Sequence, residues 1–203
     1  HNQKNGDNKI AALFGLHASL TLSDKTLERC KRSVPAGVGF HIHLAEAEAD
    51  QQDSLQKYGM RVTERLYKHD ILGEHTIAVH GIHLDEMEMD LLAETKTWVT
   101  HQPRSNMNNA VGLPEVERML EKGIPVCLGN DGFSNAMWEE WKTAYLSHKL
   151  IKKSPAAMNG NLIVDMAIKN NRKLVNQLFK NTQIGEIKIG ATADLIVVDY
   201  HPH

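Results

Sequence analysis

Apolar and polar residues alternate along the chain in blocks that are typical of strands and helices following one another. Short apolar runs predict five strands, at residues 10–17, 39–44, 76–82, 97–101 and 125–129. Between them, helical spacing of apolar residues predicts helices at about residues 23–32, 53–69, 85 onward and 114–123. Strands that alternate with helices in this way indicate an α/β fold with a parallel sheet.

The pattern changes after residue 131. Two longer helices are predicted at about residues 136–152 and 162–179. The segment IGEIKIGATADLIVVDY that follows reads as two strands separated by a Gly-Ala-Thr-Ala turn, with no helix between them. We therefore expect a second, all-β module to begin near Gly185.

One predicted strand carries an unusual group of polar residues. In the stretch GFHIHLAEAEAD, His41 and His43 share one face of the strand because side chains alternate along it. Glu46 joins them only if the chain bends near Leu44 or Ala45. We expect that bend, because α/β barrels and open α/β sheets place their chemistry at the C-terminal ends of the strands.

The other predicted strands end in the same kind of residue. His17 closes the first strand, His80 the third and His101 the fourth, and Asp131 follows the fifth. A single histidine at a strand end is more often a hydrogen-bonded structural residue than a ligand. Polar groups at all five strand ends, however, indicate a site at which they converge.

Composition narrows the class of protein. The chain has 203 residues, of which 41% are hydrophobic and 24% charged, and a net charge of −2 with scattered lysines and arginines, so a nucleic-acid partner is not expected. No apolar run is long enough to span a membrane. Cys30 and Cys127 lie in separate apolar segments with no CxxC spacing, which is typical of reduced, buried and unreactive thiols in a cytoplasmic protein. Among the twelve histidines, His69, His75 and His148 lie in polar contexts that favour a solvated imidazole.

Imidazole together with carboxylate is a ligand set that suits zinc, iron or manganese. His43 and Asp131 alone cannot hold such a metal, and at least one or two further ligands are needed. The sequence offers His80 and His41 as choices. The residues by themselves therefore predict a hydrolytic metal site with an incomplete ligand set.

Five segments resemble, in order and spacing, the C-terminal half of the amidohydrolase superfamily. They are HLAE at 43–46, VHGIHL at 79–84, THQPRSNMNN at 100–109, LGNDG at 128–132 and IGEIKIGATADLIVVD at 184–199. The most similar branch contains the metal-dependent aminohydrolases that deaminate cytosine, guanine or S-adenosylhomocysteine or dechlorinate triazines. Within it, RSNMNN and DGFSNAMWEEWK resemble the aminohydrolases of the SsnA type.

The resemblance implies a role for each of the main polar residues. His43 matches a metal ligand, and Asp131 matches the aspartate that both contacts the metal and takes a proton from its water. Glu46 matches the glutamate that passes a proton to a ring nitrogen of the substrate, and His80 matches the histidine that contacts the attacking water. His41 is interpreted as an inward-facing neighbour rather than a ligand.

Three further residues match positions that line the substrate pocket. His17 matches a substrate-contacting histidine at the end of the fourth barrel strand. Ser105 and Asn106 fall in the loop after the seventh strand. All three are therefore predicted to bind substrate.

The resemblance also implies the architecture. Residues 1–184 correspond to strands four to eight of a TIM-like (β/α)8 barrel with their helices, and residues 185–203 to the start of a small β-sandwich. The His-x-His pair of the family's first strand is missing, so the sequence is interpreted as part of a longer enzyme and expected to be inactive without those ligands. One divalent metal ion, with zinc preferred over iron or manganese, a small-molecule substrate and a cytoplasmic homodimer are expected.

The function predicted in this way is hydrolysis of a C–N bond other than a peptide bond, most specifically deamination of an amino-substituted N-heterocycle. Two alternatives stay open from the sequence. The first is a non-catalytic α/β module whose strand ends bind a metabolite or a structural metal. The second is a metal-free barrel lyase or isomerase in which Glu46 and His80 transfer protons.

Overall fold

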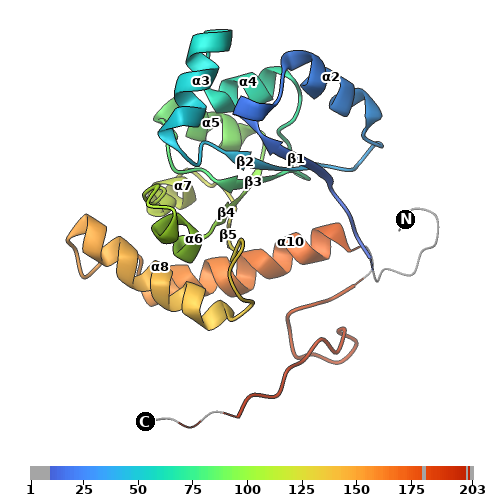
Figure 1. The fold of residues 1–203 in the computed structure, drawn as a ribbon. Helices are drawn as coiled ribbons and strands as arrows, with labels where there is room; N and C mark the ends of the chain where they lie inside the picture. Colours follow the sequence, from blue (N-terminus) through green and yellow to red (C-terminus); the bar gives the residue numbers. More distant parts are fainter. Residues whose placement is uncertain (1–9, 180–181, 200, 202–203) are drawn as a thin grey trace.

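The computed structural model describes residues 10–179, 182–199 and 201 of the protein. Within this part, five parallel strands form one sheet with the order β1-β2-β3-β4-β5 (Figure 1). They are β1 (Phe14–Ala18), β2 (Phe40–Leu44), β3 (Ile77–His80), β4 (Trp98–His101) and β5 (Val126–Leu128). All five predicted strands are present, and the prediction of a parallel α/β fold is confirmed.

Helices connect the strands and follow the last one. They are α2 (Asp24–Ser33), α3 (Glu48–Tyr58), α4 (Val62–Lys68), α5 (Glu86–Glu94), α6 (Pro103–Asn108), α7 (Val116–Glu121), α8 (Met137–Lys152), α9 (Gly160–Val164) and α10 (Asn171–Leu178). A short 3₁₀ turn, η1 (Ser19–Thr21), follows β1, and a π-helical turn, η2 (Asp165–Asn170), joins α9 to α10. Of the described helices, none combines the length and apolar character needed to cross a bilayer.

The two faces of the sheet have different surroundings. In β2, Phe40, Ile42 and Leu44 are buried in the core that the sheet forms with the helices, as strand alternation requires. His41 and His43 point to the opposite face, which in β3 carries Ile77 and Val79. One face covered by helices and one face directed inward is the arrangement of a barrel wall.

Two connections differ from the prediction. The helix expected at 53–69 is two helices, α3 and α4, because Gly59 takes a left-handed conformation with φ 69° and ends α3. The segment after β4, expected to be a loop, contains the short helix α6, with Pro103 in its first turn. The sequence PRSNMN has no apolar periodicity, so this helix gave little signal in the sequence.

The described residues of the segment 182–199 contain no strand, so the two strands predicted there are not formed. The apolar side chains that gave the strand signal are exposed, with Ile187 at 92% and Val197 at 102% relative exposure. A strand requires a hydrogen-bonded partner, and this segment runs away from the sheet in Figure 1. The division into domains at 184/185 stays a prediction, and residues 200, 202 and 203 lie outside the described residues.

Candidate active site

The candidate catalytic residues lie at one edge of the sheet, where the parallel strands end. His43 is the fourth residue of β2, and Glu46 follows that strand after Ala45. His80 is the last residue of β3, and Asp131 lies just beyond β5. Ala45, His80 and Asp131 all have positive φ, at 45°, 76° and 50°. The bend predicted before Glu46 is therefore present, and turns of this kind hold side chains at the strand edge at some conformational cost.

His43 is oriented by the neighbouring strand. Its Nδ1–H donates to the main-chain oxygen of His17 at 2.8 Å. This bond fixes the tautomer and leaves the lone pair of Nε2 available, as in metal-bound histidines that are held through their second nitrogen. The His43 ring also packs against the rings of His17 and His80, with centroid distances of 5.4 and 5.6 Å.

His80 lies fully buried between the two candidate carboxylates. Its Nδ1–H donates to Asn106 Oδ1 at 2.8 Å. Within the described part of the chain, its Nε2 has no hydrogen-bond partner, and it lies 3.5 Å from Glu46 Oε2 and 3.8 Å from Asp131 Oδ2. A buried, unpartnered nitrogen between two carboxylates indicates a place where another polar group binds.

Helix α6 and the residue that follows it, Asn109, contact His80 and both carboxylates. Besides the Asn106 contact with His80, Ser105 Oγ donates to Asp131 Oδ2 at 2.6 Å, and Asn109 Nδ2 donates to Glu46 Oε1 at 3.3 Å. Ser105 and Asn106 are buried, with 4% and 0% exposure. Both were predicted to bind substrate. In the structure their side chains hold catalytic candidates, while their contact with a substrate stays a prediction.

The remaining predicted residues have clear positions. His17 is exposed on β1 near the same edge, and its Nδ1 lies 3.0 Å from Thr21 Oγ1. His41 lines a cavity of about 340 Å³ together with Leu13 and Leu178. Burial, followed by the neighbouring His43, lowers the pKa of His41.

A buried histidine pair beside the site was missed in the sequence. His101 and His148 are 0% and 2% exposed, and their Nε2 atoms lie 3.1 Å apart. Burial lowers the pKa of His101 well below its usual value and that of His148 to about 4, so both rings are neutral at pH 7. The prediction of a solvated His148 was wrong, because His148 lies on the buried face of α8 together with Glu140, Ala144 and Ser147.

Cys127 is also buried, and burial raises the pKa of its thiol to about 12. A thiol with such a pKa is protonated at neutral pH and a poor nucleophile. This agrees with the prediction that it is unreactive.

The donor set at the strand edge fits part of a metal site. His43 offers a free Nε2, and Asp131 offers a carboxylate that lies 3.8 Å from His80 Nε2. In the described residues, no group of three or more histidine, cysteine, aspartate or glutamate side chains is close enough to hold a metal ion. His43 and Asp131 therefore fit as two ligands of a larger set.

Residues 3–203 match the model of the amidohydrolase family. The chain belongs to the amidohydrolase family. It is 34% identical over 203 residues to a 5'-deoxyadenosine deaminase of Methanosarcina acetivorans, a match that covers 97% of this chain and 46% of the relative. It is 36% identical to a 5-methylthioadenosine/S-adenosylhomocysteine deaminase of Syntrophobacter fumaroxidans, covering 92% of this chain and 43% of the relative.

A solved structure agrees with this membership. An adenosine deaminase from Xanthomonas campestris with bound zinc superposes with a TM-score of 0.85 at 28% identity, covering 96% of this chain and 45% of that chain. The amidohydrolase chain described here thus spans about half the length of the curated relatives it matches. The resemblance inferred from the five motifs is confirmed at the level of the family, and the finer resemblance to SsnA-type proteins stays a prediction.

Proposed function

We propose that this amidohydrolase chain belongs to an enzyme that hydrolytically deaminates an amino-substituted N-heterocycle and releases ammonia. The observation that carries the proposal is the buried, unpartnered Nε2 of His80 between the carboxylates of Glu46 and Asp131. The names of the relatives, which are deaminases of adenine nucleosides, point to the same class of substrate.

In this proposal, His43 and Asp131 are two ligands of a divalent metal ion, and the other ligands lie outside the described residues. Zinc is the first candidate because it is bound in the similar adenosine deaminase, and iron and manganese are the alternatives. When bound, such an ion lowers the pKa of water to about 7 and so supplies hydroxide at neutral pH.

The side chains of this chain then divide the proton transfers between them. Asp131 takes a proton from the attacking water, and Ser105 keeps the carboxylate oriented through its 2.6 Å hydrogen bond. Glu46 delivers a proton to the ring nitrogen, which makes the amino-bearing carbon electrophilic. The oxygen of water adds to that carbon, and the C–N bond breaks as the amine takes the proton held by Asp131 and leaves as ammonia. The proton that remains on the added oxygen returns to Glu46 as the carbonyl forms.

His80 is suited to donate or accept a hydrogen bond at the reacting oxygen through Nε2, because Asn106 occupies its Nδ1–H. The Nδ1–H bond makes Nε2 the acceptor in the neutral ring and a donor once the ring is protonated. His80 can therefore accept a hydrogen bond from the attacking water when its ring is neutral and donate one to the negatively charged oxygen when its ring is protonated.

The test is ammonia release by the protein at its full natural length. We expect turnover of 5'-deoxyadenosine or 5-methylthioadenosine that a chelator abolishes and added zinc restores. Tight binding without turnover would instead favour a non-catalytic metabolite-binding module. Activity that survives complete metal removal would favour a metal-free lyase or isomerase. A homodimer and a cytoplasmic location stay predictions from the sequence.

A further inference from the structure

The turn that presents Glu46 depends on a single residue in an unfavourable backbone conformation. Ala45 lies between the end of β2 and the start of α3, with φ at 45°. A non-glycine residue in this region is uncommon and persists when its surroundings hold it there. Small rotations at Ala45 would move the carboxylate of Glu46 relative to His80.

Asp50 holds the amide side of this turn. Its carboxylate is 3% exposed, and Oδ2 accepts the main-chain N–H of Ala45 at 3.0 Å. Its other oxygen, Oδ1, accepts the main-chain N–H of Leu20 at 3.1 Å. One side chain on the first turn of α3 thus fixes the turn after β2 to the turn after β1. A carboxylate in this position commonly bonds the N-cap of its own helix, whereas Asp50 reaches two residues further back.

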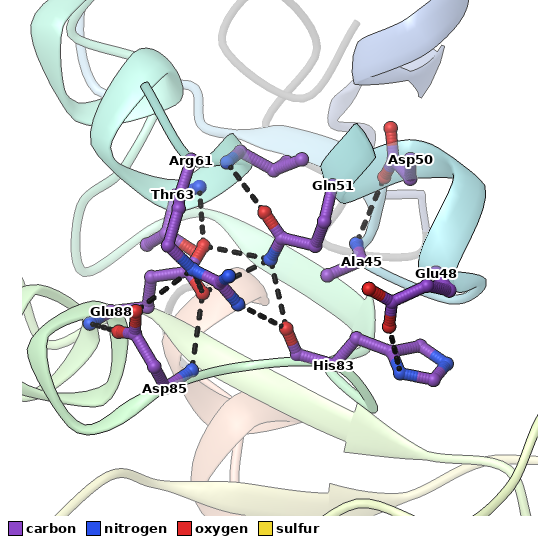
Figure 2. A network of polar contacts seen from close by, with 10 residues as sticks. Ala45, Glu48, Asp50, Gln51, Arg61, Thr63, His83, Asp85 and Glu88 are labelled. Carbon is purple, nitrogen blue, oxygen red and sulfur yellow. Dashed lines mark hydrogen bonds and ion pairs between the residues drawn. The ribbon is translucent and has the colours of Figure 1, made fainter. Parts of the chain in front are cut away.

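The carbonyl side of Ala45 is held by a second set of contacts. Its oxygen accepts the N–H groups of Ile82 and His83 at 3.2 and 3.0 Å. The His83 carbonyl in turn accepts from Gln51 Nε2 at 2.9 Å and from Arg61 Nη2 at 2.7 Å. Figure 2 shows Asp50 against Ala45 on one side of this cluster and the Gln51, Arg61 and His83 contacts on the other.

Among the described residues, Asp50 forms no ion pair, and the charge of Arg65 lowers its pKa less than its backbone hydrogen bonds do. Desolvation raises the pKa of Asp50, and the hydrogen bonds from Ala45 and Leu20 act in the opposite direction. Backbone N–H groups are therefore the main groups that solvate this carboxylate inside the protein. Replacing it would leave the buried N–H of Ala45 and the partly buried N–H of Leu20 without this acceptor.

We propose that Asp50 is a positioning residue for Glu46: it fixes the Ala45 turn and thereby sets where the glutamate carboxylate stands relative to the reacting ring. The inference rests on the proposed deaminase function and adds to it a residue that does not contact the substrate. It predicts that Asp50 affects the chemical step far more than substrate binding, since a displacement of about 1 Å in a catalytic group can cost about 100-fold in rate.

The first test is Asp50→Asn in the full-length protein. The asparagine keeps one acceptor oxygen but turns an NH2 group toward the second backbone N–H, so one hydrogen bond is replaced by a contact between two donors. We expect kcat to fall about 10- to 100-fold while KM changes less than about threefold. Asp53→Asn, the same change one turn on in α3, removes the ion pair with Lys57 and a like charge near Asp50 but keeps the bonds to Ala45 and Leu20, and it should leave kcat within about twofold of wild type.

The second test is a double-mutant cycle with Glu46→Gln. If Asp50 acts through Glu46, adding Asp50→Asn to Glu46→Gln should lower kcat by less than about threefold further. The reason is that Glu46→Gln has already removed the carboxyl group that Asp50 positions. Losses that multiply, or a folded Asp50→Asn protein with wild-type kcat, would overturn the proposal. If Asp50→Asn does not fold, Asp50→Ser, which is smaller and keeps one acceptor oxygen, enters the same cycle with the same criteria.

The cycle also separates this inference from the proposed function. Wild-type ammonia release in Glu46→Gln would contradict the role of Glu46 itself and with it the proposed mechanism. A strong loss in Glu46→Gln together with no effect of Asp50→Asn would contradict only the positioning role of Asp50.

Discussion

The two carboxylates of the candidate site are held in different ways. Glu46 follows a turn at Ala45 whose N–H donates to the buried carboxylate of Asp50 and whose C=O accepts from the N–H groups of Ile82 and His83 after β3. Asp131 lies in a segment, 131–136, in which every residue is exposed, and its carboxylate is held by the side chain of Ser105. The backbone next to Glu46 is thus held at both its N–H and its C=O group, whereas Asp131 is held through its side chain.

This difference suggests a division of tasks within the site. A proton donor must meet a ring nitrogen in a narrow range of positions, so a fixed backbone turn suits Glu46. In the proposed mechanism Asp131 contacts both a metal and water, and it is held by the Ser105 hydrogen bond in an exposed segment. Arg104 contributes to that side by bonding both Glu139 and Glu140 at the start of α8.

The largest effect is expected at Asp131 itself. Asp131→Asn removes the carboxylate that takes the proton from water, and we expect kcat to fall by about 10³-fold. Steady-state ammonia release, together with the melting temperature, measures this. Asp90→Asn, on an exposed ion pair with Lys122, is the matched control and should have wild-type activity. A loss of less than about tenfold in Asp131→Asn would contradict its role as the proton acceptor.

Stability should depend on pH through the histidine pair on the Asp131 side. The pKa of His148 is lowered from 6.5 to about 4, so the unfolded chain binds a proton between these values and the folded protein does not. The contribution of the neutral ring is therefore complete above pH 6.5 and is lost as the pH falls toward 4, by about 3 kcal/mol. Other groups near His148 are Glu115, Glu117, Lys152 and His101.

Urea unfolding at several pH values between 7 and 4.5 checks this expectation. In His148→Gln the position no longer titrates, so the decline in unfolding free energy over this range should become shallower. An equally steep decline in the variant would show that other groups cause it.

Glu139 and Glu140 offer a matched comparison of exposed and buried contacts with the same arginine. Glu140 is fully buried and accepts from Arg104 Nε at 2.6 Å, whereas the Glu139 side chain is 63% exposed. We expect Glu140→Gln to lower the free energy of unfolding by about 2 kcal/mol, since Arg104 keeps its other partners, and Glu139→Gln by less than about 1 kcal/mol. Chemical denaturation of both variants measures the difference. Equal losses would mean that burial of the Arg104 contact is unimportant for this side of the site.

The smallest effect is expected from the α6 contact with His80. Asn106→Ala removes the acceptor of His80 Nδ1–H and should lower kcat by about tenfold through loss of the fixed tautomer. Asn108→Ala, an exposed position two residues on in the same helix, should have little effect. If both variants behave alike in turnover assays, the His80 tautomer does not depend on Asn106.

The strand-end residues could be predicted from the sequence because they depend on local patterns. The apolar runs locate β2, β3 and β5, and parallel strands necessarily bring His43, His80 and Asp131 to one edge. The bend before Glu46 followed from the need to turn the glutamate toward the histidines, and Ala45 supplies it.

The contacts that hold these residues could not be predicted in the same way. Asp50 lies before the helix predicted at 53–69 and has no predicted role, since its partners at Ala45 and Leu20 are backbone groups that leave no signal in the sequence. The buried pair of His101 and His148 joins residues 47 positions apart, and neither sequence context marks it. Local periodicity in the sequence does not predict which polar groups become buried by tertiary packing.

The most direct test of the whole account is the metal content of the full-length protein, measured by plasma mass spectrometry in wild type and in a variant carrying His43→Ala and Asp131→Ala. The account predicts about one zinc, iron or manganese ion per wild-type chain and its loss from a variant that remains folded. A folded wild-type protein that is metal-free after purification without chelator, or a variant that keeps its metal, would contradict it.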